Sequence, residues 1–133
     1  GTVVAGSSTI NNSGALSVSG AASFTVNQGE SIDLTNAGNS FVTDPVFISA
    51  GPGNINNIAV TDITDITIQN NLVINGDLSI TATNITLQDT NVGIDLDLTA
   101  NKMTIVLPFT LIGEIAQTGD LIVGGTRIGR AHV

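Results

Sequence analysis

Apolar and polar residues alternate along most of this chain, in short runs that end at glycine, asparagine, aspartate or serine. The alternation is clearest in segments 16–34 and 72–87. The apolar positions are Leu16, Val18, Ala22, Phe24, Val26, Ile32 and Leu34 in the first segment, and Leu72, Ile74, Leu78, Ile80, Ala82, Ile85 and Leu87 in the second. Because successive side chains of a strand point to opposite faces, this period of two predicts strands with one buried face.

Further strands are predicted wherever the same alternation returns. They lie at 46–48, 58–60, 66–68, 94–98 and 103–107. Each is bounded by residues that favour turns. No long segment carries apolar residues at the i, i+3, i+4, i+7 spacing of an amphipathic helix, so the sequence predicts an all-β fold.

The two clearest segments repeat one another. Leu16 matches Leu72 at an offset of 72 − 16 = 56 residues, and Leu34 matches Leu87 at an offset of 87 − 34 = 53 residues. The strands keep their spacing while a turn absorbs the difference. Repetition of this size indicates a solenoid, in which each unit buries its apolar face against its neighbours, with two to three coils of roughly 20 residues per unit.

Two stretches also resemble a known family. "SGALSVSGAASFTVNQGESIDLTNAGNSF" and "TDITDITIQNNLVINGDLSITATNITLQDTN" resemble the strand repeats of filamentous-haemagglutinin-type adhesins, which are bacterial exoproteins exported by two-partner secretion. The resemblance covers about residues 7–100. It implies a right-handed parallel β-helix. The family's Asn-Pro-Asn secretion signature does not occur here, so the resemblance is to the shaft of such a protein.

The chain divides by composition near residue 100. Residues 1–100 carry the strand repeats, whereas 101–133 match them poorly and contain Pro108 and all the basic residues. We expect the second part to be a cap, a junction or a strand donated to a neighbour. A β-sandwich fibre subunit, with a strand donated from 2–6 or 103–112, is the alternative fold.

The charge balance excludes two classes of partner. Eleven acidic residues face three basic ones, for a formal net charge of −8, and the first basic residue is Lys102. Nucleic-acid backbones and anionic lipids both require a basic surface. The apolar run 103–113 is too short to span a bilayer, so no membrane insertion is expected. Gly1 suggests a processed start, with any export signal missing from this sequence.

The candidate reactive residues are few. His132 is the single histidine, in a terminal position where a mobile tail is expected. Asp62 with Asp65, and Asp95 with Asp97, are the closest carboxylate pairs, as a polysaccharide-cleaving enzyme would require. We expect these to be solvent-facing charges, and no catalytic, cofactor-binding or metal-binding residue is assigned. The chain is expected not to be an enzyme.

Asp95 and Asp97 would share the polar face of one strand, because they lie two residues apart. Ile94, Leu96 and Leu98 would then form the opposite, buried face. Lyases of this type usually use basic residues to stabilise charge and aromatic residues to stack sugars. Both kinds of residue are scarce here, which disfavours the enzymatic interpretation.

Calcium is the metal that these acids would suit, since carboxylate and amide oxygens are its usual ligands. Neither the EF-hand spacing nor the Gly-Gly-x-Gly-x-Asp repeat occurs, however, so no cofactor is expected. Segments 51–54 and 124–125 are interpreted as turns. Glycosylation at the sequons that begin at Asn11 and Asn84 is left open.

Asparagine and threonine recur in patterns with two interpretations each. The asparagines at predicted turns are Asn27, Asn36, Asn56, Asn57, Asn75, Asn84 and Asn91. They could stack as amide ladders between coils, but turn preference is favoured. Thr61, Thr64 and Thr67 would suit an ice-binding face only in irregular register.

The sequence therefore favours a non-catalytic structural or adhesive protein of the bacterial cell surface, located outside the cell. It would be a rod segment of an adhesin or extracellular fibre. The alternatives are a self-polymerising subunit joined by strand donation, a glycan- or ice-binding module, and a phage tail fibre segment. The expected partners are copies of the chain or adjoining repeats, and surface glycans or proteins.

Overall fold

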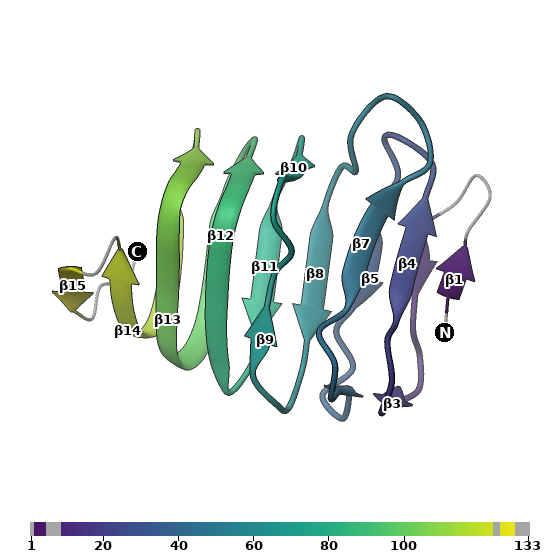
Figure 1. The fold of residues 1–133 in the computed structure, drawn as a ribbon, viewed down its shortest axis with the longest axis horizontal. Coiled ribbons are helices and arrows are strands. Elements are labelled where there is room, and N and C mark those ends of the chain that lie inside the picture. The colour runs from purple at the N-terminus through teal and green to yellow at the C-terminus, as the bar shows by residue number, and fades with distance from the viewer. Residues whose placement is uncertain (1, 5–8, 124–125, 130–133) are drawn as a thin grey trace.

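The computed structural model describes residues 2–4, 9–123 and 126–129, and these are built from strands and turns with no helix among them. The strands are β1 (Thr2–Val4), β2 (Ile10–Asn11), β3 (Ser17–Val18), β4 (Ser23–Val26), β5 (Ile32–Leu34), β6 (Ser40–Phe41), β7 (Val46–Ser49), β8 (Ile58–Thr61), β9 (Ile66–Thr67), β10 (Leu72–Ile74), β11 (Leu78–Thr81), β12 (Asn84–Val92), β13 (Leu96–Leu111), β14 (Ile115–Val123) and β15 (Thr126–Gly129). Most of them pair in parallel with the strand one coil further along the chain (Figure 1).

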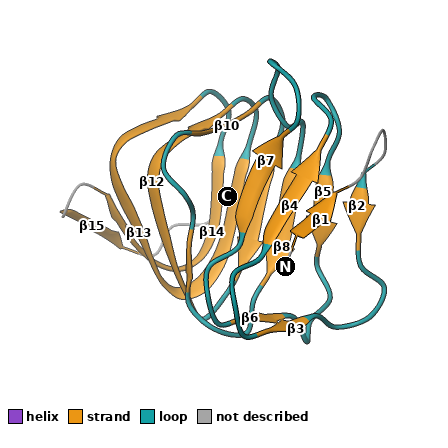
Figure 2. Cartoon of the chain, turned by 45° about the vertical axis from the view of Figure 1, so that its right-hand side comes forward, coloured by secondary structure: helices purple, strands orange, loops and turns teal. Residues whose placement is uncertain are grey.

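The chain winds into a right-handed parallel β-solenoid of about six turns, which confirms the predicted fold (Figure 1). Each turn crosses three faces (Figure 2). Face 1 contains β2, β5, β8, β11 and the first parts of β13 and β14. Face 2 contains β3, β6, β9 and residues 84–88, 102–106 and 120–123. Face 3 contains β1, β4, β7, β10 and residues 90–92 and 109–111.

Coil length varies, and this variation decides where the sequence repeat falls. Equivalent residues in adjacent coils are 18 apart at Asp77 and Asp95 but 26 apart at Ser31 and Asn57. As a result, Leu16 lies just before β3 on face 2, whereas its sequence match Leu72 begins β10 on face 3. The repeated pattern therefore marks the alternation of strands and corners, and the structural unit is the single coil.

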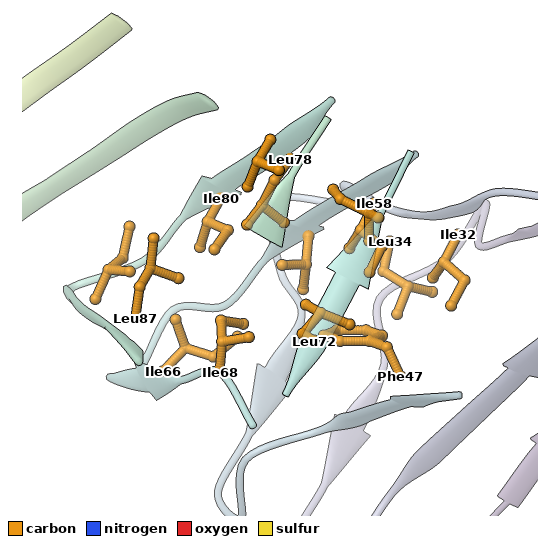
Figure 3. Close-up of a cluster of buried hydrophobic side chains, with 14 of the residues drawn as sticks. Ile32, Leu34, Phe47, Ile58, Ile66, Ile68, Leu72, Leu78, Ile80 and Leu87 are labelled. Atoms are coloured by element: carbon orange, nitrogen blue, oxygen red, sulfur yellow. The ribbon is translucent and has the colours of Figure 1, made fainter. Parts of the chain in front are cut away.

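The interior consists of apolar rows that run along the solenoid. On face 1 the two buried rows are Ile10, Ile32, Ile58, Leu78 and Leu96, and Leu34, Val60, Ile80 and Leu98. Figure 3 shows several of these side chains facing those of β9 and β10 across the interior. Burying one such side chain contributes roughly 1.5–3 kcal/mol. Of the predicted inward positions in the two repeat segments, all are buried except Leu16, Val18 and Ala82, which are half-buried against the core.

Three phenylalanines fill the interior of the second and third coils. The Phe24 ring lies edge-on to the Phe41 ring, with centroids 5.9 Å apart, and is stacked on the Phe47 ring at 6.1 Å. All three rings are buried. Such contacts add about 0.5–1.5 kcal/mol beyond the area that they bury.

The corner between faces 3 and 1 is tight and requires glycine. A Cβ atom on Gly93 would lie 2.2 Å from the carbonyl oxygen of Asn75, and one on Gly113 would lie 2.1 Å from that of Ile94. Both glycines also donate backbone hydrogen bonds to the preceding coil, Gly93 to Ile74 at 3.0 Å and Gly113 to Ile94 at 2.7 Å. The backbones of adjacent coils approach too closely at these two positions for a Cβ atom.

The ladder on face 1 is continuous, whereas those on faces 2 and 3 are each interrupted once. The strands fall into a ten-stranded sheet with branches, a three-stranded sheet β1-β4-β7 and a two-stranded sheet β3-β6. Face 2 is therefore interrupted between β6 and β9, and face 3 between β7 and β10. Side chains bridge both gaps.

The β-sandwich alternative is wrong, because the parallel coils form a solenoid. The segment 2–4 of the expected donor strand pairs in parallel with β4 of the same chain. Strand β13 crosses residue 100 and pairs with β14 on both sides of it, with a register shift between Thr99 and Lys102. Beyond that point β15 pairs antiparallel with β14, with Thr126 opposite Val123.

Candidate functional surface

A row of threonines follows the outside of face 1. Thr61, Thr81, Thr99 and Thr118 are in register on β8, β11, β13 and β14. Thr61 is half-buried and the other three are exposed. Within the described residues none of the four hydroxyl groups forms a hydrogen bond. Because neighbouring strands lie about 4.7–4.9 Å apart, the row presents hydroxyl groups at that interval along the solenoid.

A polar ladder follows the corner where the chain enters face 1. The Oδ1 atom of Asn57 accepts a hydrogen bond from the backbone N–H of Asp77 at 2.8 Å. Asp77 Oδ1 accepts one from the N–H of Asp95 at 3.0 Å, and Asp95 Oδ1 accepts one from the N–H of Glu114 at 2.9 Å. Each side chain thus satisfies a backbone donor of the next coil, which places three carboxylates in a row.

A shallow groove of about 340 Å³ lies beside this acidic row. Its lining consists of Asp77, Leu78, Ser79, Asp95, Leu96, Asp97, Glu114, Ile115 and Ala116. Lys102, the first basic residue of the chain, lies on face 2 in register with Asn84 and Asp120. The groove is therefore lined by carboxylates without a basic residue among them.

The structure brings Asp95 and Asp97 to the same groove, as the spacing predicts. Both side chains are exposed. Catalysis by a carboxylate pair works in a cleft that encloses the sugar and excludes water. This groove is open, and its lining contains no basic or aromatic residue. It therefore neither encloses a sugar nor excludes water, which makes this pair a weak candidate for acid–base chemistry.

The prediction that Ile94, Leu96 and Leu98 form a buried face opposite this pair is only partly correct. Leu96 and Leu98 are buried, but Ile94 is 50% exposed. Ile94 lies at the corner that follows Gly93, and its N–H donates to the carbonyl oxygen of Gly76 at 3.0 Å. The turn at this corner interrupts the alternation, so β13 begins only at Leu96.

The other predicted pair is not brought together. Asp62 is buried, and its Oδ1 accepts hydrogen bonds from the N–H groups of Phe41 at 3.2 Å and Thr64 at 3.0 Å. Asp65 is exposed and accepts a hydrogen bond from Asn84 Nδ2 at 2.9 Å. The expectation of a solvent-facing charge is therefore wrong for Asp62, which has a structural role inside the corner between faces 1 and 2.

No metal centre is assembled in the part of the chain that the structure describes, where no three acidic or histidine side chains converge. Segment 51–54 forms the turn after β7, in which Gly53 donates its N–H to Gln28 Oε1 at 2.7 Å. His132 and segment 124–125 lie outside the described residues.

The asparagine side chains mainly form hydrogen bonds with backbone groups. Asn36 forms a local turn by accepting the N–H of Gly38 at 2.9 Å. Two amide-to-amide contacts do connect coils, Asn12 to Asn39 at 2.8 Å and Asn54 to Asn75 at 3.3 Å. Of these four residues the sequence singled out only Asn75, because an inward asparagine such as Asn39 follows no periodic pattern.

Threonines and sequons occupy varied positions. Thr61 belongs to the face 1 row, whereas Thr67 is in register with Thr86 and Thr104 on face 2. The irregular register of Thr61, Thr64 and Thr67 is thus explained, since each lies in a different part of the coil.

The two sequons differ in accessibility. Asn11 is exposed on β2, whereas Asn84 is half-buried and its side-chain amide donates a hydrogen bond to Asp65.

The first part of the chain is similar to a known family of repeats. A family model described as "Repeats of unknown function (DUF5649)" matches residues 1–46. No curated protein and no solved structure matches the chain. In the described residues, no helix has the length and apolar character that crossing a membrane requires. The match to a repeat family agrees with the repetitive coils, and the first 46 residues are similar to that family.

Proposed function

We propose that this chain is a non-catalytic rod segment of a bacterial surface adhesin or extracellular fibre. The observation that carries the proposal is the unbroken ladder of face 1, whose rows run from Ile10 in the first coil to Ile115 in the last. A stack of this kind can be lengthened by repeating one unit, because each coil contacts only its neighbours. Length and stiffness are the properties that a rod requires.

The two ends of the stack support addition of further coils. Leu16 and Val18 in the first coil, and Leu111 and Ile115 in the last, pack against the core but are only half-buried. A neighbouring coil would cover their exposed area and pair with the strand edges. Adjoining repeats of a longer chain, or further copies of this one, are the partners that fit these ends.

The surface chemistry supports a location outside the cell. A formal net charge of −8 disfavours nucleic-acid and anionic-lipid binding and keeps neighbouring rods from aggregating. The exposed outer rows can vary without disturbing the buried rows, so adhesion to surface glycans or proteins would reside there. The resemblance to adhesin strand repeats points in the same direction.

Microscopy of a tandem chain tests the proposal. Two copies joined head to tail in one polypeptide are imaged by negative staining. Six coils at about 4.8 Å each extend about 30 Å, so a continuous tandem rod extends about 60 Å. A single straight particle of that length is expected. Two separately oriented globules would argue against a rod segment.

An activity assay tests the non-catalytic part. The chain is incubated with acidic polysaccharides, and the release of new reducing ends is compared with that of an Asp95→Asn/Asp97→Asn variant. We expect no release from either protein. Release by the unmodified chain that the double variant has lost would restore the enzymatic interpretation.

The threonine row favours a second function, glycan binding along face 1. Free hydroxyl groups on Thr81 and Thr99, beside the carboxylates of the groove, can hydrogen-bond to sugar hydroxyl groups at regular intervals. A glycan array compares the unmodified chain with a Thr81→Ala/Thr99→Ala variant. Retention of a glycan by the former alone would support this function, and the absence of any retained glycan would dismiss it.

A further inference from the structure

Face 2 lacks strand pairing between the second and third coils, where side chains supplement a backbone hydrogen bond from Ile63 to Asn39 at 2.8 Å. The backbone N–H of Phe41 on β6 donates to Asp62 Oδ1 at 3.2 Å. The hydroxyl group of Thr64 donates to the carbonyl oxygen of Phe41 at 3.2 Å and to Asp62 Oδ1 at 2.7 Å. Asp62 and Thr64 thus bind one residue of β6 in the way that a paired strand would.

Face 3 has a similar gap between the third and fourth coils. Gln69 Oε1 accepts the N–H of Phe47 on β7 at 2.9 Å, and Gln69 Nε2 donates to the carbonyl oxygen of Phe47. Backbone contacts between these two coils resume only beyond the gap, in the bridge between Ile55 and Ile74 and in the hydrogen bond from Gly76 to the carbonyl oxygen of Asn56 at 2.7 Å. One amide side chain therefore stands where the other coils on this face have a strand pair.

Both gaps are bridged from the same segment, residues 62–69, and the bridging is incomplete. Asp62 Oδ2 is buried and has no hydrogen-bond partner among the described residues. A buried polar atom without a partner destabilises the closed arrangement. Face 1, in contrast, continues through this region with four residue pairs between β8 and β11.

We propose that segment 62–69 is a joint, at which faces 2 and 3 open while face 1 acts as the hinge. Local opening free energies vary across a protein, and regions held by few hydrogen bonds open first. Opening would separate β6 from β9 and β7 from β10, and would loosen the packing around Phe24. A rod under tension would therefore yield at this joint before its uniformly paired coils separate.

Residue-resolved hydrogen exchange of the intact chain tests the joint. The amide protons of Phe41 and Phe47 are compared with those of Val60 and Ile80, which lie in the face 1 ladder. We expect the first two to exchange at least about fivefold faster, the factor that one net hydrogen bond represents. Equal protection of all four amides would overturn the proposal.

A matched pair of variants sharpens the test. Gln69→Met removes both contacts to Phe47, whereas Gln88→Met changes a half-buried glutamine on the outside of the paired strand β12. Only Gln69→Met should accelerate exchange at Phe47 while leaving Ile80 unchanged. An equal effect of both variants, or a uniform loss of protection throughout the chain, would contradict the joint. If Gln69→Met does not fold, the comparison within the unmodified chain decides.

The mechanical meaning of the joint rests on the proposed rod function, but the opening itself does not. If the tandem chain does not form rods but Phe41 and Phe47 still exchange faster, the rod function is refuted and the joint is not. If the tandem chain forms rods but all four amides exchange equally, the joint is refuted and the rod function is not.

Discussion

Substituting Gly93 with alanine tests whether the close approach of coils at the corner limits stability. The added Cβ atom would lie 2.2 Å from the carbonyl oxygen of Asn75 and 2.7 Å from its carbonyl carbon, both of them backbone atoms. Real Cβ atoms essentially never come nearer than 3.0 Å, so the two coils must separate by about 0.8 Å. That movement would lengthen the 3.0 Å hydrogen bonds from Gly93 to Ile74 and from Ile94 to Gly76 beyond useful range. The loss of two hydrogen bonds and the displacement of the coils should together lower the free energy of unfolding by about 2–3 kcal/mol.

The control for this substitution is Gly20→Ala. No atom lies within 4 Å of a Cβ atom at Gly20, so the alanine fits without displacement. Alanine restricts the unfolded chain, and the control should be unchanged or up to about 1 kcal/mol more stable. Urea unfolding followed by far-ultraviolet circular dichroism is the assay, because the chain has no tryptophan or tyrosine to report by fluorescence. Equal midpoints for the two variants would refute the argument that close packing at the corner requires glycine.

Three further outcomes follow from the structure. Ile80→Ala, in the middle of a buried face 1 row, should lower the free energy of unfolding by about 2–5 kcal/mol in urea titration, and a loss under 1 kcal/mol would contradict tight packing. Asp62→Ala leaves the N–H of Phe41 without its acceptor and should destabilise the chain by about 1–3 kcal/mol, whereas an unchanged midpoint would dismiss the bridging role of Asp62. Asp95→Asn keeps the oxygen that accepts the N–H of Glu114 but removes one charge from the acidic row. At low salt the melting temperature of this variant should be higher than that of the unmodified chain. The two should converge near 1 M salt, where the Debye length of about 3 Å screens the repulsion between the carboxylates. A difference in melting temperature that does not depend on salt would contradict repulsion along the row.

Alternation of apolar residues predicts the strands and the interior well, because it depends only on the geometry of a strand. The alternation predicts Ile80 and Leu87 inside, and both are buried. The corners escape such a prediction, since a corner rotates the chain and resets the alternation. Ile94 shows this, because it continues the apparent pattern of Leu96 and Leu98 yet lies outside.

The candidate surface is harder to predict from the sequence than the core is. Its rows join residues from successive coils, and variable coil length hides their register. Thr81 is 20 residues from Thr61 but 18 from Thr99, so no fixed period identifies the row. The bridging roles of Asp62 and Gln69 depend on gaps in pairing that only the assembled coils create. A polar residue in an alternating segment indicates an outward position, and Asp62 departs from that rule.

The unequal coils have an evolutionary consequence. The third coil contains a long connection between Ser49 at the end of β7 and Ile58 at the start of β8, while β8 still pairs in full register with β5 and β11. Corners can therefore accept inserted residues without shifting the strands on either side. A lineage of such proteins could acquire new surface loops, or even whole inserted modules, at these corners while its shaft stays the same.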